Sequence, residues 1–205
     1  MRFGRITISG GFLLMLALVY FFDVNGFVPL VLLTALVHEL GHFFAIWALG
    51  GRVRRLHLGL VGLCMDYEGG RIGYPGEIVI ALAGPLLNFG MAYGASFLGR
   101  YIGSETAFFL AGISLGACVF NMLPVYQLDG GRILYCVLAW AGDVEFAFRV
   151  VCVTSCVVIF ALLIAGFWLF VWSHWNFTLL TAALWLLISY CKNGGNAVRY
   201  IVAKH

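Results

Sequence analysis

Long, nearly uncharged apolar stretches recur along this chain and leave only short polar segments between them. A stretch of roughly 20 apolar residues is what an α-helix needs to cross the hydrocarbon core of a bilayer. The composition agrees, because 63% of the residues are apolar and 10% are charged, whereas a soluble domain is nearer about half apolar and about a quarter charged. We therefore predict an all-α polytopic membrane protein, forming one membrane-embedded domain over residues 1–205. About six transmembrane helices are expected, near residues 6–22, 27–49, 77–98, 107–123, 146–167 and 176–190.

The first of these stretches follows a short basic N-terminus and has the length of a signal peptide. Bulky or charged residues follow it, namely Phe21, Phe22 and Asp23, in place of the small residues of a cleavage site. We therefore predict that residues 6–22 are a retained membrane anchor.

The basic residues give the six-span topology a direction. If both termini are cytoplasmic, all of the 12 basic residues except Arg100 lie on the cytoplasmic side. This distribution supports the span count, because lysine and arginine are enriched in cytoplasmic loops. The net charge is only +3, and the basic residues are scattered over loop boundaries, so they form no basic surface for nucleic acid. We predict an integral protein of a bacterial plasma membrane, with its termini and its polar centre toward the cytoplasm.

Three ionisable side chains, His38, Glu39 and His42, interrupt the second predicted span. Ionisable groups at bilayer depth are costly and mark functional sites. The two histidines are spaced i and i+4, so on a helix both rings can reach one metal ion, and the glutamate between them suits a general base acting on metal-bound water. A pair of core histidines satisfied by neighbours is the alternative. The cost of leaving polar groups unpaired in hydrocarbon weighs against it.

The loop after the second span contains an alternating segment, Leu56 to Leu63, followed by turn-rich residues 66–76. Alternation favours a strand, so we expect a small β-hairpin-like cytoplasmic loop, with a plain connecting loop as the alternative. The edge of a hairpin could pair with an extended substrate by strand addition.

Two later segments bring further polar groups to the membrane. Asn88 follows Pro85 in the third span and either bonds a neighbouring helix or holds a substrate carbonyl. After the fourth span the chain breaks before Pro124 and leaves Asp129 on a glycine-flanked turn at the cytoplasmic side. Two histidines and one carboxylate make three protein ligands with a fourth position open for water, which is the pattern of a catalytic zinc site. The sequence therefore predicts a Zn²⁺ site at His38, His42 and Asp129, with Glu39 as the base.

Taken in order, these motifs resemble the site-2 protease family of intramembrane zinc metalloproteases. The residues that carry the resemblance are His38 to His42 as HExxH, Gly84 to Asn88 as Gly-Pro-x-x-Asn, and the Asn...Pro...Asp-Gly signature at Asn121, Pro124, Asp129 and Gly130. The compact six-span form is similar to the stage IV sporulation protein FB type without its C-terminal cystathionine-beta-synthase domain. The PDZ domain of another branch does not occur in the printed sequence either.

The resemblance implies a metalloendopeptidase that cleaves a membrane-tethered protein in or near its transmembrane segment, with a catalytic core at about residues 27–132. It also implies that Asn88 and Asn121 hold the substrate strand or the developing oxyanion, and it leaves room for a sporulation role and a regulatory membrane partner. Two other functions stay open on the residues alone. One is a non-catalytic zinc-containing scaffold that binds transmembrane segments, and the other is a small ion or metal transporter.

Overall fold

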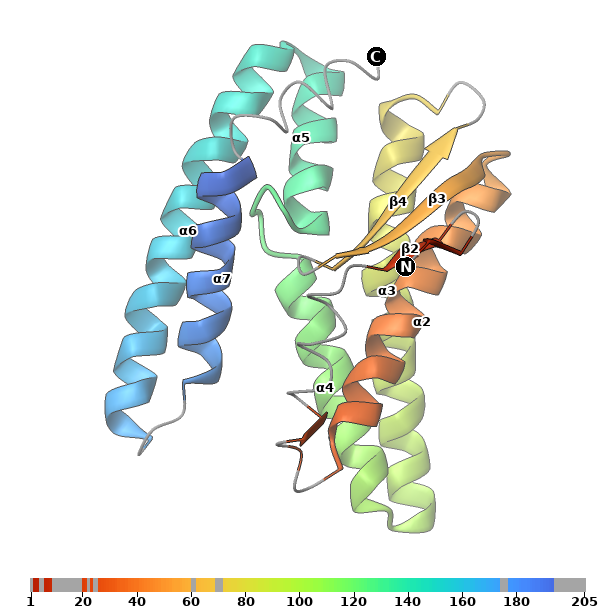
Figure 1. The fold of residues 1–205 in the computed structure, drawn as a ribbon, viewed down its shortest axis with the longest axis vertical. Coiled ribbons are helices and arrows are strands. Elements are labelled where there is room, and N and C mark those ends of the chain that lie inside the picture. The colour runs from red at the N-terminus through yellow and green to blue at the C-terminus, as the bar shows by residue number, and fades with distance from the viewer. Residues whose placement is uncertain are drawn as a thin grey trace. The chain divides into compact units, whose positions relative to one another are not determined.

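The computed structural model describes residues 2–3, 6–8, 20–21, 23, 26–59, 62–68, 72–173 and 177–193. The chain divides into two compact units, Met1–Asn121 and Met122–His205. The elements of the first unit are β1 Arg2–Phe3, β2 Ile6–Ile8, α2 Val28–Ala48, β3 Arg52–Gly59, β4 Gly62–Glu68, α3 Tyr74–Ile102 and α4 Glu105–Asn121. Those of the second unit are α5 Asp129–Ala141, α6 Val144–Trp172 and α7 Thr178–Asn193 (Figure 1). The protein is mainly helical, as the composition predicts.

Helix α3 forms the middle of the first unit and packs against both α2 and α4 (Figure 1). The contact between α2 and α3 is one of backbone against backbone. A Cβ atom added at Gly41 would lie 2.5 Å from the Ala83 carbonyl oxygen and 2.9 Å from the Gly84 Cα. Glycine at this crossing therefore lets the two helices approach more closely than any larger residue would allow.

The segment after α2 forms the β3–β4 hairpin, so the prediction of a hairpin-like loop is confirmed. Strands β3 and β4 are antiparallel, β2 pairs with β3 in parallel, and β1 completes a sheet of order β1-β2-β3-β4.

Two boundaries differ from the prediction. Residues 66–68 continue β4 and are not part of a turn. Residues 6–8 form β2 and do not begin a membrane helix, because the β-branched pattern Ile-Thr-Ile finds a pairing partner in β3. Most of the remaining predicted first span lies outside the described residues.

The hairpin is fastened to the helices by one buried polar contact inside an apolar cluster. Ile46, Tyr67 and Ile80 are buried together where β4 meets α2 and α3. Within this cluster the Tyr67 hydroxyl lies 2.7 Å from each carboxylate oxygen of Glu77, at the start of α3. A hydrogen bond to a buried carboxylate contributes about 1.5–3 kcal/mol. The edge strand β4 is therefore held at a fixed place on α3.

Among the described helices, three are long and apolar enough to cross a membrane, namely α2, α3 and α6. Helices α4 and α7 are apolar but have 17 and 16 residues, which at about 1.5 Å per residue is shorter than the ~30 Å hydrocarbon core. The predicted number of six spans is thus not confirmed. The spans predicted near residues 27–49, 77–98 and 146–167 do correspond to α2, α3 and α6.

The second unit consists of α5, α6 and α7, with α6 packed against the other two. Helix α6 begins after Asp143, whose side chain accepts hydrogen bonds from the backbone N–H groups of Glu145 and Phe146. This cap satisfies donors that a helix start leaves free. At the other end, a Cβ at Gly166 would lie 2.9 Å from the Leu180 Cα, so α6 and α7 approach closely there. Outward-facing side chains such as Val153, Phe160 and Phe167 make the free face of α6 apolar.

Candidate metal centre

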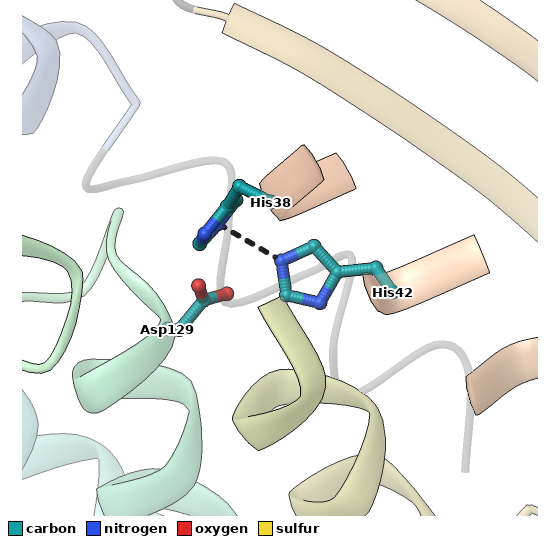
Figure 2. A group of neighbouring side chains, drawn as sticks. All are labelled: His38, His42 and Asp129. Carbon is teal, nitrogen blue, oxygen red and sulfur yellow. Dashed lines mark hydrogen bonds between the residues drawn. The ribbon is translucent and has the colours of Figure 1, made fainter. Parts of the chain in front are cut away.

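The two histidines of α2 place their ring nitrogens next to each other. His38 is buried and His42 is half-buried, and their Nε2 atoms lie 3.1 Å apart with the rings edge to face (Figure 2). A tetrahedral zinc ion with Zn–N distances of about 2.0–2.1 Å has its nitrogen ligands roughly 3.3 Å apart. The spacing between the two Nε2 atoms therefore suits a shared metal ion with little adjustment.

Helix α3 sets the orientation of the His42 ring. The Nδ1 atom of His42 lies 2.7 Å from the carbonyl oxygen of Ile80. A carbonyl oxygen can only accept, so Nδ1 carries the proton and Nε2 keeps the lone pair that a metal needs. A backbone carbonyl cannot be identified as a partner from the sequence, and this support was not predicted.

Gly84 of α3 provides the space that the rings occupy. A Cβ atom at this position would lie 2.5 Å from His42 Nε2 and 2.8 Å from His38 Cε1. Any larger residue would push against both rings, which explains why the Gly-Pro-x-x-Asn segment begins with glycine.

Asn88, one turn further along α3, lies against His38. It is fully buried, and its Nδ2 atom is 3.3 Å from His38 Nδ1. Among the described residues, its Oδ1 atom is buried without a hydrogen-bond partner. Within the first unit, the structure thus brings together His38, His42 and Asn88.

Asp129 is the first residue of α5 and does not sit on a free turn, which corrects the local prediction. An aspartate is favoured at a helix start, where the helix dipole stabilises its negative charge. The residues before it fold back, with hydrogen bonds from Val125 N to the Leu123 oxygen and from Leu128 N to the Val125 oxygen. Cβ atoms at Gly130 and Gly131 would collide with this backbone, at Met122 and Val125 respectively. The two glycines therefore serve close packing at a helix start.

The segment 122–128, which we call the Asp129 loop, is pinned to the neighbouring helices. The hydroxyl of Ser155 on α6 is fully buried, accepts a 2.9 Å hydrogen bond from the Tyr126 backbone N–H and donates to the Val151 carbonyl. Gln127 donates from Nε2 to the Leu186 carbonyl of α7 at 3.5 Å. These supports come from a part of the sequence that carries no recognisable motif.

A cavity of about 180 Å³ opens beside the start of α5, and its lining includes Tyr126, Asp129, Arg132 and Tyr135. Burial raises the pKa of Tyr126 to about 12. At neutral pH its hydroxyl therefore stays protonated and uncharged.

The other two predicted site residues lie at defined places on the helices. Glu39 is half-buried on α2, next to His38 and off the face that the imidazoles share. Asn121 is the last residue of α4, and its Nδ2 donates to the Ala117 carbonyl of the same helix at 3.0 Å. That bond uses one of the two N–H groups of the amide, and the substrate role of Asn121 stays a prediction.

The donor set suits zinc. His38, His42 and Asp129, drawn in Figure 2, offer two ring nitrogens and a carboxylate oxygen as ligand atoms. Zinc takes imidazole and carboxylate ligands, and three protein ligands are the number found in its catalytic sites. The two histidines belong to the first unit and Asp129 to the second.

Comparisons with known sequences point to one group of proteins. The model of Peptidase family M50 matches residues 100–165, which include the Asp129 loop. A zinc metalloprotease of Methanocaldococcus jannaschii is 28% identical over 117 residues, covering 54% of this chain and 33% of the relative. Stage IV sporulation protein FB of Bacillus subtilis is 29% identical over 144 residues, covering 69% of this chain and 49% of the relative. The chain thus spans about a third to a half of the length of these relatives.

The fold has a match among solved structures. A site-2 protease from Methanocaldococcus jannaschii superimposes with a TM-score of 0.67 at 21% sequence identity. The similarity covers 91% of this chain and 89% of that one. At this identity the match establishes the shared fold, which extends well beyond the residues that the family model covers.

Proposed function

Because this chain belongs to the site-2 protease family, peptidase family M50, we propose that it is an intramembrane zinc metalloprotease. Its reaction would be hydrolysis of a peptide bond in or near a transmembrane segment of a membrane-tethered protein. The observation that carries the proposal is the pair of imidazoles on an apolar helix, whose Nε2 atoms lie 3.1 Å apart with His42 already in the metal-binding tautomer. A histidine pair kept for packing would not need this arrangement.

In the proposed site His38, His42 and Asp129 hold Zn²⁺. A zinc ion held there would lower the pKa of water toward about 7 and polarise a carbonyl group. Glu39 would serve as the general base that accepts a proton from the attacking water and as the acid that returns it to the leaving amine. Proton transfer by a positioned carboxylate contributes about 10²–10⁴-fold to the rate. Asn121 is proposed to hold the substrate strand or the developing oxyanion.

The substrate must be extended to present its peptide bond, and the sheet suggests how. Among the described residues, strand β4 forms one edge of the sheet, so its outer backbone groups can pair with an added strand. The Tyr67–Glu77 contact fixes this edge on α3, the helix that also carries Gly84 and Asn88. We propose that β4 receives the unwound substrate, on the cytoplasmic side of a bacterial plasma membrane.

The proposal is tested by changing the base and leaving the metal ligands in place. Purified wild type, Glu39→Gln and Glu105→Gln proteins would be given a membrane-tethered reporter in liposomes, and the zinc content of each would be measured. Glu105 is an exposed carboxylate at the start of α4, and its amide variant is the matched control. We expect Glu39→Gln to keep its zinc and to cut about 10²–10⁴-fold more slowly, with the control unaffected.

Other outcomes point to other functions. Full cleavage by Glu39→Gln would refute the proposed mechanism. A wild type that binds zinc and transmembrane segments without ever cutting them would be a scaffold, and zinc or ion uptake into the same liposomes would identify a transporter.

A further inference from the structure

We infer that Asn88 is a positioning residue of the metal centre, whose amide holds the ring of His38 in either of its two neutral tautomers. This inference rests on the proposed zinc site and concerns residues of the first unit alone. It assigns Asn88 a role different from substrate binding.

Three contacts of the two rings fit one assignment of protons for the case in which no metal ion lies between the Nε2 atoms. His42 carries its proton on Nδ1, because the partner there is the Ile80 carbonyl at 2.7 Å. If the 3.1 Å contact between the two Nε2 atoms is a hydrogen bond, its proton comes from His38 Nε2, because His42 Nε2 is then the acceptor. His38 Nδ1 is left as an acceptor, and the Asn88 Nδ2 atom donates to it at 3.3 Å. Each of these contacts is thus a donor facing an acceptor.

Metal binding reverses the tautomer of His38. Both rings must then present a lone pair at Nε2, so the His38 proton has to sit on Nδ1. One proton leaves Nε2 and one is gained at Nδ1, so the ring is neutral before and after. An N–H group at Nδ1 needs an acceptor, and a turned Asn88 amide offers its Oδ1 at the place where Nδ2 lies. Among the described residues Oδ1 has no partner that such a turn would break.

The choice of an amide follows from these two states. An asparagine can donate or accept at the same position, whereas a carboxylate can only accept and an aliphatic side chain can do neither. Because Asn88 is fully buried, bulk water is not at hand to replace it. His42 needs no such partner, since the Ile80 carbonyl fixes its tautomer in both states.

The test measures zinc affinity by chelator competition for wild type, Asn88→Leu, Asn88→Asp and Ser114→Ala. Leucine has similar size without hydrogen-bonding groups, and loss of a histidine's outer partner lowers metal affinity by about 10–100-fold. Aspartate can only accept, so it favours the Nδ1–H tautomer and should bind zinc at least as tightly as wild type. Ser114 is a fully buried polar residue on α4 whose hydroxyl lies 3.3 Å from that of Thr34 and donates to the Leu110 carbonyl, so its variant should match wild type.

Nitrogen NMR of the histidine rings gives a second measurement that does not depend on catalysis. Wild type should show the His38 proton on Nε2 without metal and on Nδ1 with zinc, whereas Asn88→Asp should show it on Nδ1 in both states. Unchanged zinc affinity in Asn88→Leu, or a weaker affinity in folded Asn88→Asp, would overturn the inference, and a raised KM with unchanged affinity would mark Asn88 as a substrate contact. Failure of wild type to bind zinc at all would instead contradict the proposed function.

Discussion

The two histidines and Asp129 are held in place by different means. His38 and His42 stand on a long helix whose backbone touches α3 at Gly41 and Gly84, and their ring nitrogens meet groups of α3 directly. Asp129 stands at the start of a short helix, and the loop before it is fixed by a hydroxyl of α6 and by close backbone packing. Changes near the histidines should therefore act on the rings themselves, whereas changes near Asp129 should act through the conformation of its loop.

The largest effect is expected for Gly131→Ala, which adds a methyl group where α5 packs most closely against the Asp129 loop. The new Cβ would collide with the Val125 backbone, which cannot move aside as a side chain could. We expect a loss of at least about 1–3 kcal/mol in the free energy of unfolding, the range for overpacking a filled site. Gly90→Ala is the control, because a Cβ there meets open space. If thermal unfolding of Gly131→Ala matched that of the control, the loop would not pack on α5 as described.

A smaller effect is expected for Ser155→Ala, which removes the acceptor of the Tyr126 N–H. A buried donor left without a partner costs about 1–3 kcal/mol. Zinc affinity should also fall if Asp129 is a ligand, since its loop loses this support. The neighbouring Thr154→Ala removes a hydroxyl that likewise donates to the Val151 carbonyl but holds no loop, so it should leave zinc affinity alone. Equal zinc affinities for the two variants would show that the support of the Asp129 loop by Ser155 does not contribute to zinc binding.

The smallest effect is expected for Ser114→Ala in the first unit. Its hydroxyl lies 3.3 Å from the Thr34 hydroxyl and donates to the Leu110 carbonyl. Removing it should cost about 1 kcal/mol of stability, the net value of an ordinary hydrogen bond. Zinc affinity should not change, because α3 holds the rings independently. Zinc affinity is measured together with the stability. A marked drop in zinc affinity would show that the positions of the histidines also depend on the contact between α2 and α4.

The sequence predicts well the helix that carries the two histidines. The second predicted span, residues 27–49, coincides closely with α2. The i, i+4 spacing of the two histidines holds because helix geometry alone brings such residues to one face. The hairpin was also predictable, since alternation of apolar residues is a local signal that needs no tertiary partner to be seen.

The supports of the centre were less predictable. Ile80 supports His42 through its backbone carbonyl, and Ser155 supports the Asp129 loop through a backbone N–H. Every residue type has a backbone carbonyl, so the sequence cannot indicate which one tertiary packing brings near a side chain. In the sequence, Gly130 and Gly131 indicate a turn around Asp129, whereas in the structure they permit close packing at the start of α5. Residues 6–8 read as the start of an apolar span because pairing with β3 cannot be seen locally.

We propose that His38, His42 and Asp129 bind a zinc ion that this chain needs for proteolysis. The most direct test removes the metal from the purified protein with a chelator, then restores it, and follows cleavage of a membrane-tethered reporter together with the zinc content. We predict that wild type loses cleavage and regains it as zinc is taken up, and that Asp129→Asn regains neither at the same zinc concentration. Cleavage that continues in the metal-free protein would show that zinc is not needed, and full recovery of Asp129→Asn would show that Asp129 is not a ligand.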